Sequence, residues 1–349
     1  MQGFKLGFAA ASIIAMLAGA ARAQSMDVLY AQAKAAGETS LVVYSGGPVA
    51  PYESFVKEFE TQFPTVKVSI TGGFSNVLNE QIDEQIKAGK VEVDMAFFQT
   101  AQDFVKWKKL GVLLNFKPEG YEHILPAFRE ADGAYTTTKV NAVTYGVNTK
   151  LVAPQDVPRS ALDLLNPQFA GKLITCYPAD DDATLYLFYT IVQKYGWSYM
   201  DRYMANRPNF IQGHLGVARS VAAGENVVTP DATSTVNELK AAGAPVEMVF
   251  SQEDPTPFFT LTSGIFKNAP HSNAAKLFLT WYMDPAQQSR TGVFSARDDV
   301  PPPPGFKPFS SYNAANNYVD FVSNQALLAD LRKRFEAYTG PVVNKGGVR

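Results

Sequence analysis

The sequence predicts an α/β protein of two lobes, joined by two extended crossings of the chain, with a cleft between the lobes. Strand-like runs alternate with helical patterns from residue 41 onward, which is typical of largely parallel sheets with right-handed crossovers. Two long extended segments, 140–151 and 245–266, interrupt this alternation and indicate the crossings. With 349 residues, the chain is also longer than a single hydrophobic core usually serves.

Three strand–helix units open lobe I. The strand-like runs LVVYS (41–45), KVSIT (67–71) and VDMAFF (93–98) each precede a segment with helical periodicity. In the first of these helices, apolar residues recur at positions 52, 55, 56, 59 and 63, as on one face of a helix. Open α/β sheets bind ligands beyond the carboxyl ends of their strands. The turns after the three strands are therefore expected to converge on the cleft.

A second α/β set follows the first crossing and forms lobe II. It comprises the strand LITCY (173–177), a helix after Asp182, and the strand VVTP (227–230) with a helix of its own. A later segment, 267–290, has the pattern of one well-capped helix. The predicted division of the chain is lobe I at 24–143 and 251–305, lobe II at 144–250, and a C-terminal helical segment packing on the lobes at 306–349.

The two crossings predict a hinge. A double extended connection lets two lobes rotate relative to each other, and hinge closure around a ligand is the common response of such folds. We expect closure by rotation about the crossings near Tyr145 and Phe250.

The N-terminus has the pattern of a cleaved secretory signal at residues 1–23. Lys5 precedes an apolar run, Leu6 to Ala20, and Ala21-Arg22-Ala23 matches an A-x-A cleavage site. The apolar run has 15 residues, fewer than the roughly 20 that span a bilayer. The residue directly after the cleavage site is Gln24 rather than a cysteine, so we expect a periplasmic protein without a lipid anchor.

Charge and cysteine content narrow the class of protein further. The chain has 31 basic and 33 acidic residues, and removal of Lys5 and Arg22 with the signal leaves 29 against 33. This balance argues against nucleic acid or an anionic membrane as a partner. The single cysteine, Cys176, cannot form an intrachain disulfide, and we expect an inert buried thiol.

Enzyme and metal motifs are absent from the sequence. Ser54 to Lys57 matches S-x-x-K, but its S-D-N and K-T-G companions are missing. The three histidines, His123, His214 and His271, lack the spacing of metal ligands. We therefore predict no catalytic activity, no cofactor and no metal site. A periplasmic hydrolase or lyase remains an alternative, because a catalytic dyad assembled in space leaves no sequence motif.

Lobe I offers candidate ligand-binding residues in the turns after its three strands. Glycines let backbone N–H groups approach a ligand closely, and helix N-termini favour negative charge. The turns thus predict a pocket for a phosphate, phosphonate or carboxylate. Alternatively, the glycines serve only tight turns, and a serine only caps a helix. The candidates are Ser45, Gly46, Gly47, Gly72, Gly73, Ser75, Gln99 and Thr100.

Lobe II has three consecutive carboxylates, Asp180, Asp181 and Asp182, at a strand-to-helix turn. One of the last two is expected to cap the helix. Asp180 and Asp181 are expected to face lobe I, where an ammonium group of a ligand could lie. A solvated capping cluster and a metal site are the alternatives. The further candidates are Tyr145, His214, Asp231, and Arg219, which could instead pair with Glu225.

Several stretches resemble the periplasmic solute-binding proteins of bacterial ABC importers. The matching stretches run from about Leu41 to Pro304 and include VYSGG, ITGGFSNVLNEQI, VDMAFFQT, YGVNTKLVAPQDVPRSALDLLNPQFAGKL, GVARSVAAGENVV, HSNAAKLFLTWYMDPAQQS and RDDVPPPPG. They are most similar to the ferric-iron, polyamine and sugar-phosphate branch of the family-1 extracellular solute-binding proteins. The resemblance implies a two-lobe (type II) fold that closes on a small-molecule solute and docks on an inner-membrane permease. We expect a monomer.

The resemblance also bears on the identity of the solute. In ferric-binding relatives, adjacent tyrosines after the strand matching Val227-Val228 hold the iron, whereas this chain reads TPDATSTVNE there. We therefore expect that iron is not the cargo, with a ferric-binding protein as the alternative. Complementarity of the two lobes predicts a zwitterion, with its anion at the lobe I turns and its amine facing Asp180 and Asp181.

Overall fold

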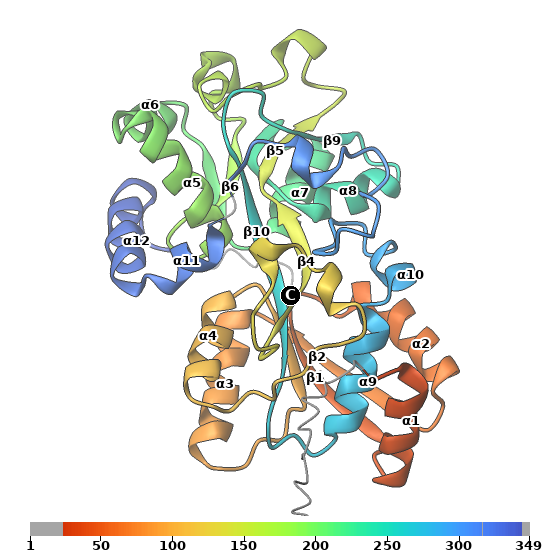
Figure 1. Ribbon diagram of the computed structural model, residues 1–349. Coiled ribbons are helices and arrows are strands. Elements are labelled where there is room, and N and C mark those ends of the chain that lie inside the picture. The colour runs from red at the N-terminus through yellow and green to blue at the C-terminus, as the bar shows by residue number, and fades with distance from the viewer. Residues whose placement is uncertain (1–23, 316, 344–349) are drawn as a thin grey trace, which may run out of the picture.

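The computed structural model describes residues 24–315 and 317–343. Two α/β lobes are stacked end to end (Figure 1), which confirms the predicted fold class. The signal predicted at residues 1–23 lies outside the described residues. Among the helices that are described, none combines the length and the apolar character needed to cross a membrane.

The sheet of lobe I has six strands. β1 (Ser40–Gly46) lies in parallel between β2 (Lys67–Gly73) and β3 (Met95–Phe98). The long β10 (Thr256–Ile265) pairs antiparallel with β3, and β4 (Thr136–Ala142) pairs antiparallel with β10. The short β11 (Ala314–Ala315) pairs in parallel with the start of β10.

Helices cover both faces of this sheet. α1 (Met26–Ala35), α2 (Glu53–Gln62) and α9 (Ser272–Tyr282) pack on one face, and α3 (Ser75–Lys87) and α4 (Ala101–Lys109) on the other. The apolar stripe predicted for α2 faces the core, where Phe55 and Phe59 contact α9.

The single helix predicted at 267–290 is divided in two. α9 ends at Tyr282, and α10 (Pro285–Gln288) begins after Asp284. Pro285 cannot donate the backbone bond that would continue α9, and Asp284 accepts a bond from the N–H of Ala286 as the cap of the new helix.

The sheet of lobe II is smaller and mixed. β5 (Thr144–Asn148) lies antiparallel between β8 (Val228–Ala232) and β9 (Val246–Val249). β6 (Ile174–Cys176) pairs in parallel with β7 (Asn209–Ile211), and a bridge from Leu173 to Val228 joins these strands to β8. The three strands behind the expectation of a largely parallel sheet, β1 to β3, are parallel, whereas β5, the first crossing, enters lobe II antiparallel to both of its neighbours.

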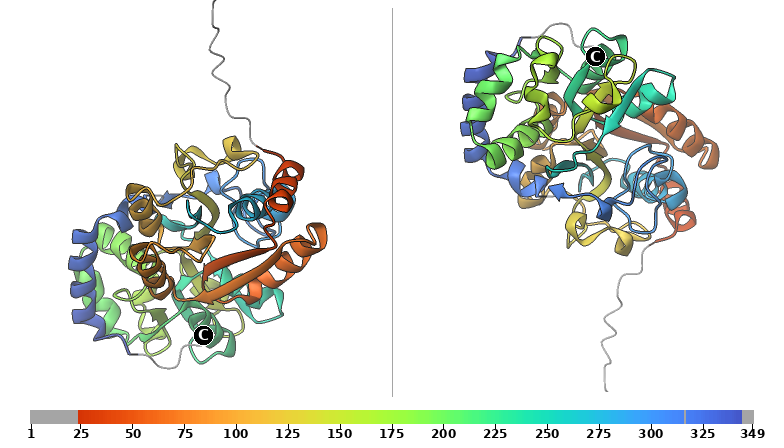
Figure 2. Two further views of the ribbon diagram at one scale, coloured as in Figure 1. Left: turned by 90° about the horizontal axis from the view of Figure 1, so that it is seen from below. Right: turned by 90° about the horizontal axis from the view of Figure 1, so that it is seen from above.

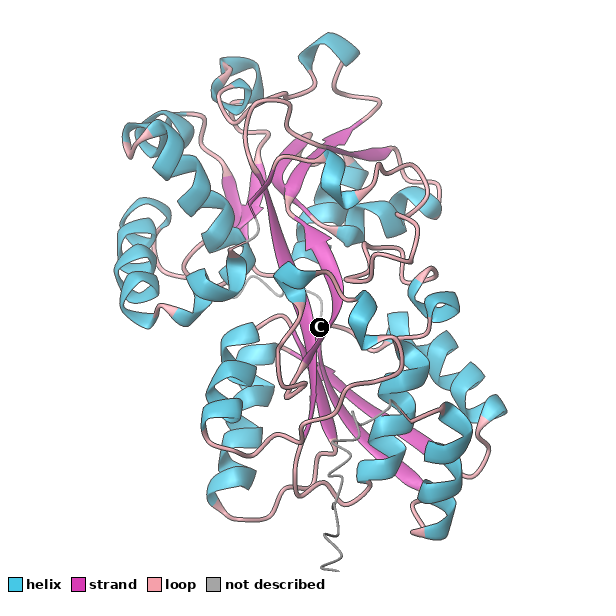
Figure 3. Ribbon diagram, in the orientation of Figure 1, coloured by secondary structure: helices cyan, strands magenta, loops and turns pink. Residues whose placement is uncertain are grey.

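Helices also flank the lobe II sheet on both sides. α5 (Asp182–Tyr195) and α6 (Ser198–Ala205) pack on one face, and α7 (His214–Ala223) and α8 (Ser234–Ala241) on the other. In Figure 3, the strands form a central spine through both lobes, and the helices lie outside it.

The C-terminal helices complete lobe II and also reach lobe I. α12 (Gln325–Thr339) packs on α5, and Phe335 contacts Phe188 in the lobe II core. α11 (Tyr318–Ser323) contacts α4 and β10 of lobe I. Figure 2 shows α12 and α1 on opposite flanks of the molecule.

The two crossings lie where β4 leads into β5 and β9 leads into β10. They pass through Val143 and through residues 250–255, next to the predicted hinge positions Tyr145 and Phe250. The lobe boundaries that the sequence predicts, and the rotation itself, stay predictions.

Candidate functional site

The three strand ends of lobe I converge. A Cβ atom placed on Gly46 would lie 2.2 Å from Ser75 Oγ and 2.5 Å from Gln99 Oε1. Ser75 in turn donates to Gln99 Oε1 over 2.8 Å. Because these residues follow β1, β2 and β3 respectively, the structure brings the predicted turns together at one edge of the sheet.

Backbone conformation accounts for Gly47 at this edge, and close packing accounts for Gly72. Gly47 has a φ of +91° and donates its N–H to the carbonyl of Gly73 over 2.7 Å. A Cβ on Gly72 would lie 2.6 Å from the carbonyl oxygen of Gly47. Tight turns thus need these glycines whether or not a ligand is bound, and direct ligand contact stays a prediction.

The helices that begin at this edge have no side-chain caps. The N-cap of α3 is Phe74, and Ser75 is the first helical residue rather than the cap that the alternative interpretation proposed. The N-cap of α4 is Thr100, whose Oγ1 is buried without a hydrogen-bond partner among the described residues. Ser45 is fully buried. Two uncapped helix N-termini make this edge favourable for negative charge.

The three consecutive aspartates of lobe II have separate partners. Asp181 caps α5, because its Oδ1 accepts from the N–H groups of Ala183 and Thr184, each over 2.9 Å. Burial would raise its pKa, but His214 and the two N–H groups lower it to about 2. The prediction that Asp181 or Asp182 caps this helix is confirmed.

Asp180 is the aspartate with the fewest partners. Its Oδ2 accepts from Gln212 Nε2 over 2.9 Å, and its side chain is half-buried. Burial and the neighbouring Asp181 raise its pKa, although the bond from Gln212 lowers it. A carboxylate in such surroundings is stabilised when a cation comes close.

Asp182 reaches lobe I, a role that sequence analysis gave to Asp180 and Asp181. Its Oδ2 accepts from Gln102 Nε2 of α4 over 2.9 Å, and its Oδ1 pairs with Arg332 of α12 over 2.5 Å. Burial raises its pKa, and Arg332 partly offsets the effect. No sequence pattern marks this contact, because Arg332 lies 150 positions away.

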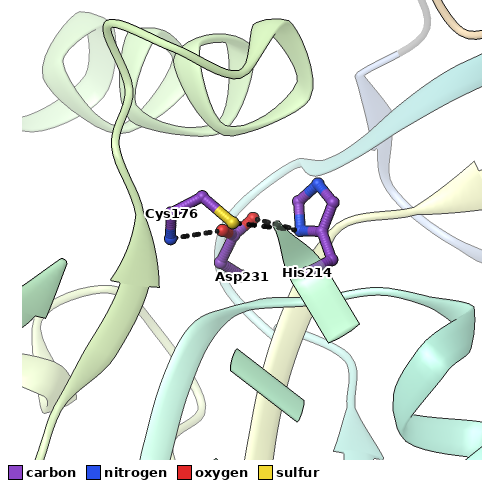
Figure 4. Close-up of side chains that lie close together, drawn as sticks. All are labelled: Cys176, His214 and Asp231. Carbon is purple, nitrogen blue, oxygen red and sulfur yellow. Dashed lines mark hydrogen bonds and ion pairs between the residues drawn. The ribbon is translucent and has the colours of Figure 1, made fainter. Parts of the chain in front are cut away.

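His214 is the centre of a second cluster at the strand ends of lobe II. Its Nε2 lies 3.4 Å from Asp181 Oδ1, and its Nδ1 lies 3.5 Å from Asp231 Oδ1 and 3.7 Å from Cys176 Sγ. Figure 4 shows the thiol, the imidazole and the Asp231 carboxylate side by side. They come from the end of β6, the start of α7 and the strand β8.

Burial and neighbouring groups together set the protonation of this cluster. Burial alone would lower the pKa of His214, but Cys176, Asp231 and Asp181 raise it well above its ordinary value. Burial raises the pKa of Cys176 to about 12, so the group is a thiol at neutral pH. A nucleophilic cysteine acts as an accessible thiolate. The apparent Cys–His–Asp triad is therefore poorly suited to catalysis.

Two other candidates lie away from these clusters. Tyr145 is 3% exposed and donates its hydroxyl to Asp254 of the second crossing over 3.1 Å. This contact joins Tyr145 to the second crossing, and its contact with a ligand stays a prediction. Arg219 is exposed on α7, and the pair with Glu225 that was one of its two alternatives does not occur among the described residues. Glu225 accepts from Ser220 instead.

Four contributors to these clusters were not predicted as site residues from the sequence, and one of them is Gln212, the partner of Asp180. Gln102 and Arg332 stand on separate helices, and only the packing of α4 and α12 brings them to Asp182. Cys176 is a free, buried thiol as expected, and its position at the end of β6 also places it against His214. The position of Cys176 at the end of a strand could have predicted this contact, because side chains converge at the strand ends of α/β sheets.

Comparisons with known proteins bear on both the family and the fold. Residues 54–316 match the model of a family described as "Bacterial extracellular solute-binding protein". The Fe(3+)-binding periplasmic protein of Serratia marcescens is 21% identical over 270 residues, which cover 74% of this chain and 78% of that protein.

Two solved structures share the architecture. The periplasmic binding protein AfuA from Actinobacillus pleuropneumoniae, with exogenous fructose-6-phosphate bound, has a TM-score of 0.73 at 18% identity over 86% of this chain and 98% of that one. Iron-bound HitA from Pseudomonas aeruginosa has a TM-score of 0.71 at 17% identity, and the match covers 85% of this chain and 99% of that one. Likeness at these identities establishes the fold.

Proposed function

Because the chain belongs to the family of bacterial extracellular solute-binding proteins, we propose that it captures a small zwitterionic solute between its two lobes in the periplasm. We further propose that it then delivers this solute, unchanged, to an ABC permease of the inner membrane. Binding of a small-molecule solute follows from the family. The charge of the solute, the delivery and the residues involved are our inference.

The surplus of acid at the strand ends of lobe II carries this proposal. Four carboxylates lie there, and His214 and Arg332 are the cations in contact with them. A solute with an ammonium or another cationic group would offset the excess negative charge. Asp180 is the best placed to receive it, since Gln212 is its one side-chain partner among the described residues. The four carboxylates are Asp180, Asp181, Asp182 and Asp231.

The uncapped helix N-termini of lobe I favour the opposite charge, which is negative. The N-termini of α3 and α4 favour an anionic group such as a phosphate, a phosphonate or a carboxylate. A solute with both charges would contact both lobes, and this differential binding would favour a closed arrangement over an open one.

The tyrosines of lobe II support a solute other than ferric iron. The hydroxyl of Tyr186 donates to Asn317 Oδ1, and the ring of Tyr189 stacks on Phe321. Asp231 lies near the end of β8, and the chain from there into α8 contains no tyrosine. Tyr186 and Tyr189 thus pack α5 against Asn317 and α11. The relatives named for ferric iron keep the ferric alternative open to test.

The decisive experiment is to identify the solute and then to remove one charge. Native mass spectrometry of freshly purified protein, followed by a thermal-shift screen of zwitterionic compounds, would find candidates, because a ligand of the folded state raises the unfolding midpoint. Asp180→Asn should then weaken binding by about 1–3 kcal/mol, the scale of a charge-assisted hydrogen bond. Asp330→Asn, an exposed change on α12, is the matched control.

Two outcomes would contradict the proposal. Unchanged affinity in Asp180→Asn would remove the cationic subsite. Turnover of the solute by the purified protein would instead favour the hydrolase or lyase alternative.

A further inference from the structure

We propose that Cys176, His214 and Asp231 form a binding site for a divalent transition-metal ion of the zinc class in lobe II. The thiol sulfur, one imidazole nitrogen and one carboxylate oxygen all lie within 4.8 Å of one another. Sequence analysis predicted no metal site, because the histidines are far apart along the chain. The fold brings one of them to the single thiol and to a carboxylate on the neighbouring strand (Figure 4).

The spacing of the donor atoms fits one tetrahedral ion. With a Zn–S bond of about 2.3 Å and Zn–N and Zn–O bonds of about 2.0–2.1 Å, tetrahedral angles place sulfur about 3.6 Å from nitrogen and nitrogen about 3.3 Å from oxygen. The observed separations from His214 Nδ1 are 3.7 Å to Cys176 Sγ and 3.5 Å to Asp231 Oδ1. These two separations fit tetrahedral coordination, and the sulfur and the carboxylate oxygen lie within 4.8 Å of each other.

The Asp231 carboxylate is fixed by one oxygen and leaves the other without a hydrogen bond. Its Oδ2 accepts from the N–H of Cys176 over 3.0 Å and from the hydroxyls of Thr184 over 2.9 Å and Thr175 over 3.3 Å. Its Oδ1 is buried without a hydrogen-bond partner among the described residues and lies toward His214. A buried carboxylate oxygen without a partner is costly, and a coordinated cation would satisfy it.

His214 is held in the manner of a metal ligand. Its second nitrogen, Nε2, lies 3.4 Å from Asp181 Oδ1 on the side away from the thiol. A histidine that binds metal through one nitrogen commonly donates the other N–H to a carboxylate, which fixes the ring and makes it a better donor. Asp181 is itself held by two backbone N–H groups at the start of α5. The cap of α5 thus also orients the imidazole.

The donor set selects the class of metal. A thiolate, an imidazole and a carboxylate suit zinc and similar divalent transition metals, whereas magnesium and calcium prefer oxygen donors throughout. Three protein donors leave a fourth position for water or a solute group. On binding, metal–sulfur and metal–nitrogen bonds form at Cys176 Sγ and His214 Nδ1, the S–H bond and the Nδ1–H bond of the imidazolium break, and both protons go to solvent. Affinity should therefore rise with pH.

A second cluster provides a built-in comparison. His123, Asp298 and Asp299 also bring donor atoms together, but on the surface and without a thiol. The side chains of His123 and Asp298 are 44% and 55% exposed. Metal bound at this surface cluster would carry no thiolate signal, and His123→Gln removes its imidazole without touching lobe II.

Cobalt substitution tests the site directly. Cys176 is the only cysteine of the chain, so a thiolate-to-cobalt charge-transfer band can arise only there. We expect untagged protein titrated with Co²⁺ at about pH 8 to bind one ion at this site, with that band and the visible bands of tetrahedral cobalt. Zn²⁺ should abolish the bands by competition, and it should raise the unfolding midpoint.

Variants assign the signal. The bands should vanish in Cys176→Ala and persist in His123→Gln. Asp181→Asn should keep them but weaken Co²⁺ binding by about 10–100-fold, because the imidazole loses its orienting carboxylate. Circular dichroism of the metal-free variants would identify any that fail to fold.

The proposal would be overturned if wild-type protein saturated with Co²⁺ showed no charge-transfer band. That result needs no variant, so it stands even if Cys176→Ala is unstable. This inference goes beyond the proposed solute, and the two fail separately. Absence of the cobalt signal would rule out the metal site without testing solute binding. Loss of solute binding in Asp180→Asn would concern the solute site and would not test metal binding at the thiol.

Discussion

The second crossing depends on a single buried carboxylate, Asp254, and we predict that Asp254→Ala strongly destabilises the fold. Its Oδ2 accepts from the Tyr145 hydroxyl over 3.1 Å and from the N–H of Ala161 over 2.6 Å. Its Oδ1 accepts from Lys194 Nζ over 2.6 Å and from the Tyr195 hydroxyl over 2.5 Å. The carboxylate therefore ties the crossing to β5 and to the end of α5.

The expected loss follows from the donors left behind. The Tyr145 hydroxyl and the Ala161 N–H are buried, and each would lose its acceptor at about 1–3 kcal/mol. Lys194 is 38% exposed, so water can replace its ion pair, which adds little. The free energy of unfolding should thus fall by about 2–6 kcal/mol in Asp254→Ala.

The same carboxylate predicts a pH dependence. Burial would raise the pKa of Asp254, but the bonds from Lys194, Tyr195 and Ala161 outweigh burial and lower it. A group whose pKa is lower in the folded state stabilises the fold above its unfolded pKa of about 3.9, and this stability is lost as pH falls through the folded value. The difference between wild type and Asp254→Ala should therefore be largest at neutral pH and shrink in acid.

Urea unfolding at neutral and acid pH would measure both effects, with the exposed Asp330→Ala as the control. Asp254→Asn should lose less than Asp254→Ala, because the amide oxygen can still accept one bond. The reasoning is refuted if Asp254→Ala loses less than about 1 kcal/mol at neutral pH, since one orphaned donor alone should cost that much.

Three further predictions concern the cap, the cargo and the hinge. Asp181→Ala should cost about 0.5–2 kcal/mol more than Asp181→Asn in urea unfolding, because Asn can still cap α5; equal losses would contradict this. With the pKa of Asp181 near 2, its contribution should be lost only as pH falls below about 4. Ferric salt should give no red-purple colour, and such a colour at one iron per chain would establish ferric binding. Small-angle scattering should show compaction when the solute binds, and an unchanged radius of gyration at saturation would count against hinge closure.

The alternation of strands and helices was sufficient to predict the two-lobe fold. Local periodicity and strand-end turns carry that information, and they also placed the turns of Gly46, Ser75 and Gln99 together. The sequence did not predict the direction of every strand. Nothing local to 144–148 shows that this strand would enter lobe II antiparallel to its neighbours.

The candidate site was predictable only in part, because its partners come from distant segments. Three adjacent aspartates were visible, and so was the need for a cap. Which aspartate reaches lobe I depends on Gln102, 80 positions before Asp182, and on Arg332, 150 positions after it. The thiol of Cys176 had no motif around it, since its neighbour His214 lies on a different element.

The three aspartates of the acidic turn have different roles. Asp181 accepts from the backbone at the start of α5 and lies against His214, so its negative charge already interacts with the helix and the imidazole. Asp182 links α4 of lobe I to α12, so it joins the lobes even before a solute contributes. Asp180 has a single amide partner and keeps the most capacity for a ligand cation. A cap needs one acid, a link between lobes needs a second, and a receptor needs a third, which is a physical reason for three in a row.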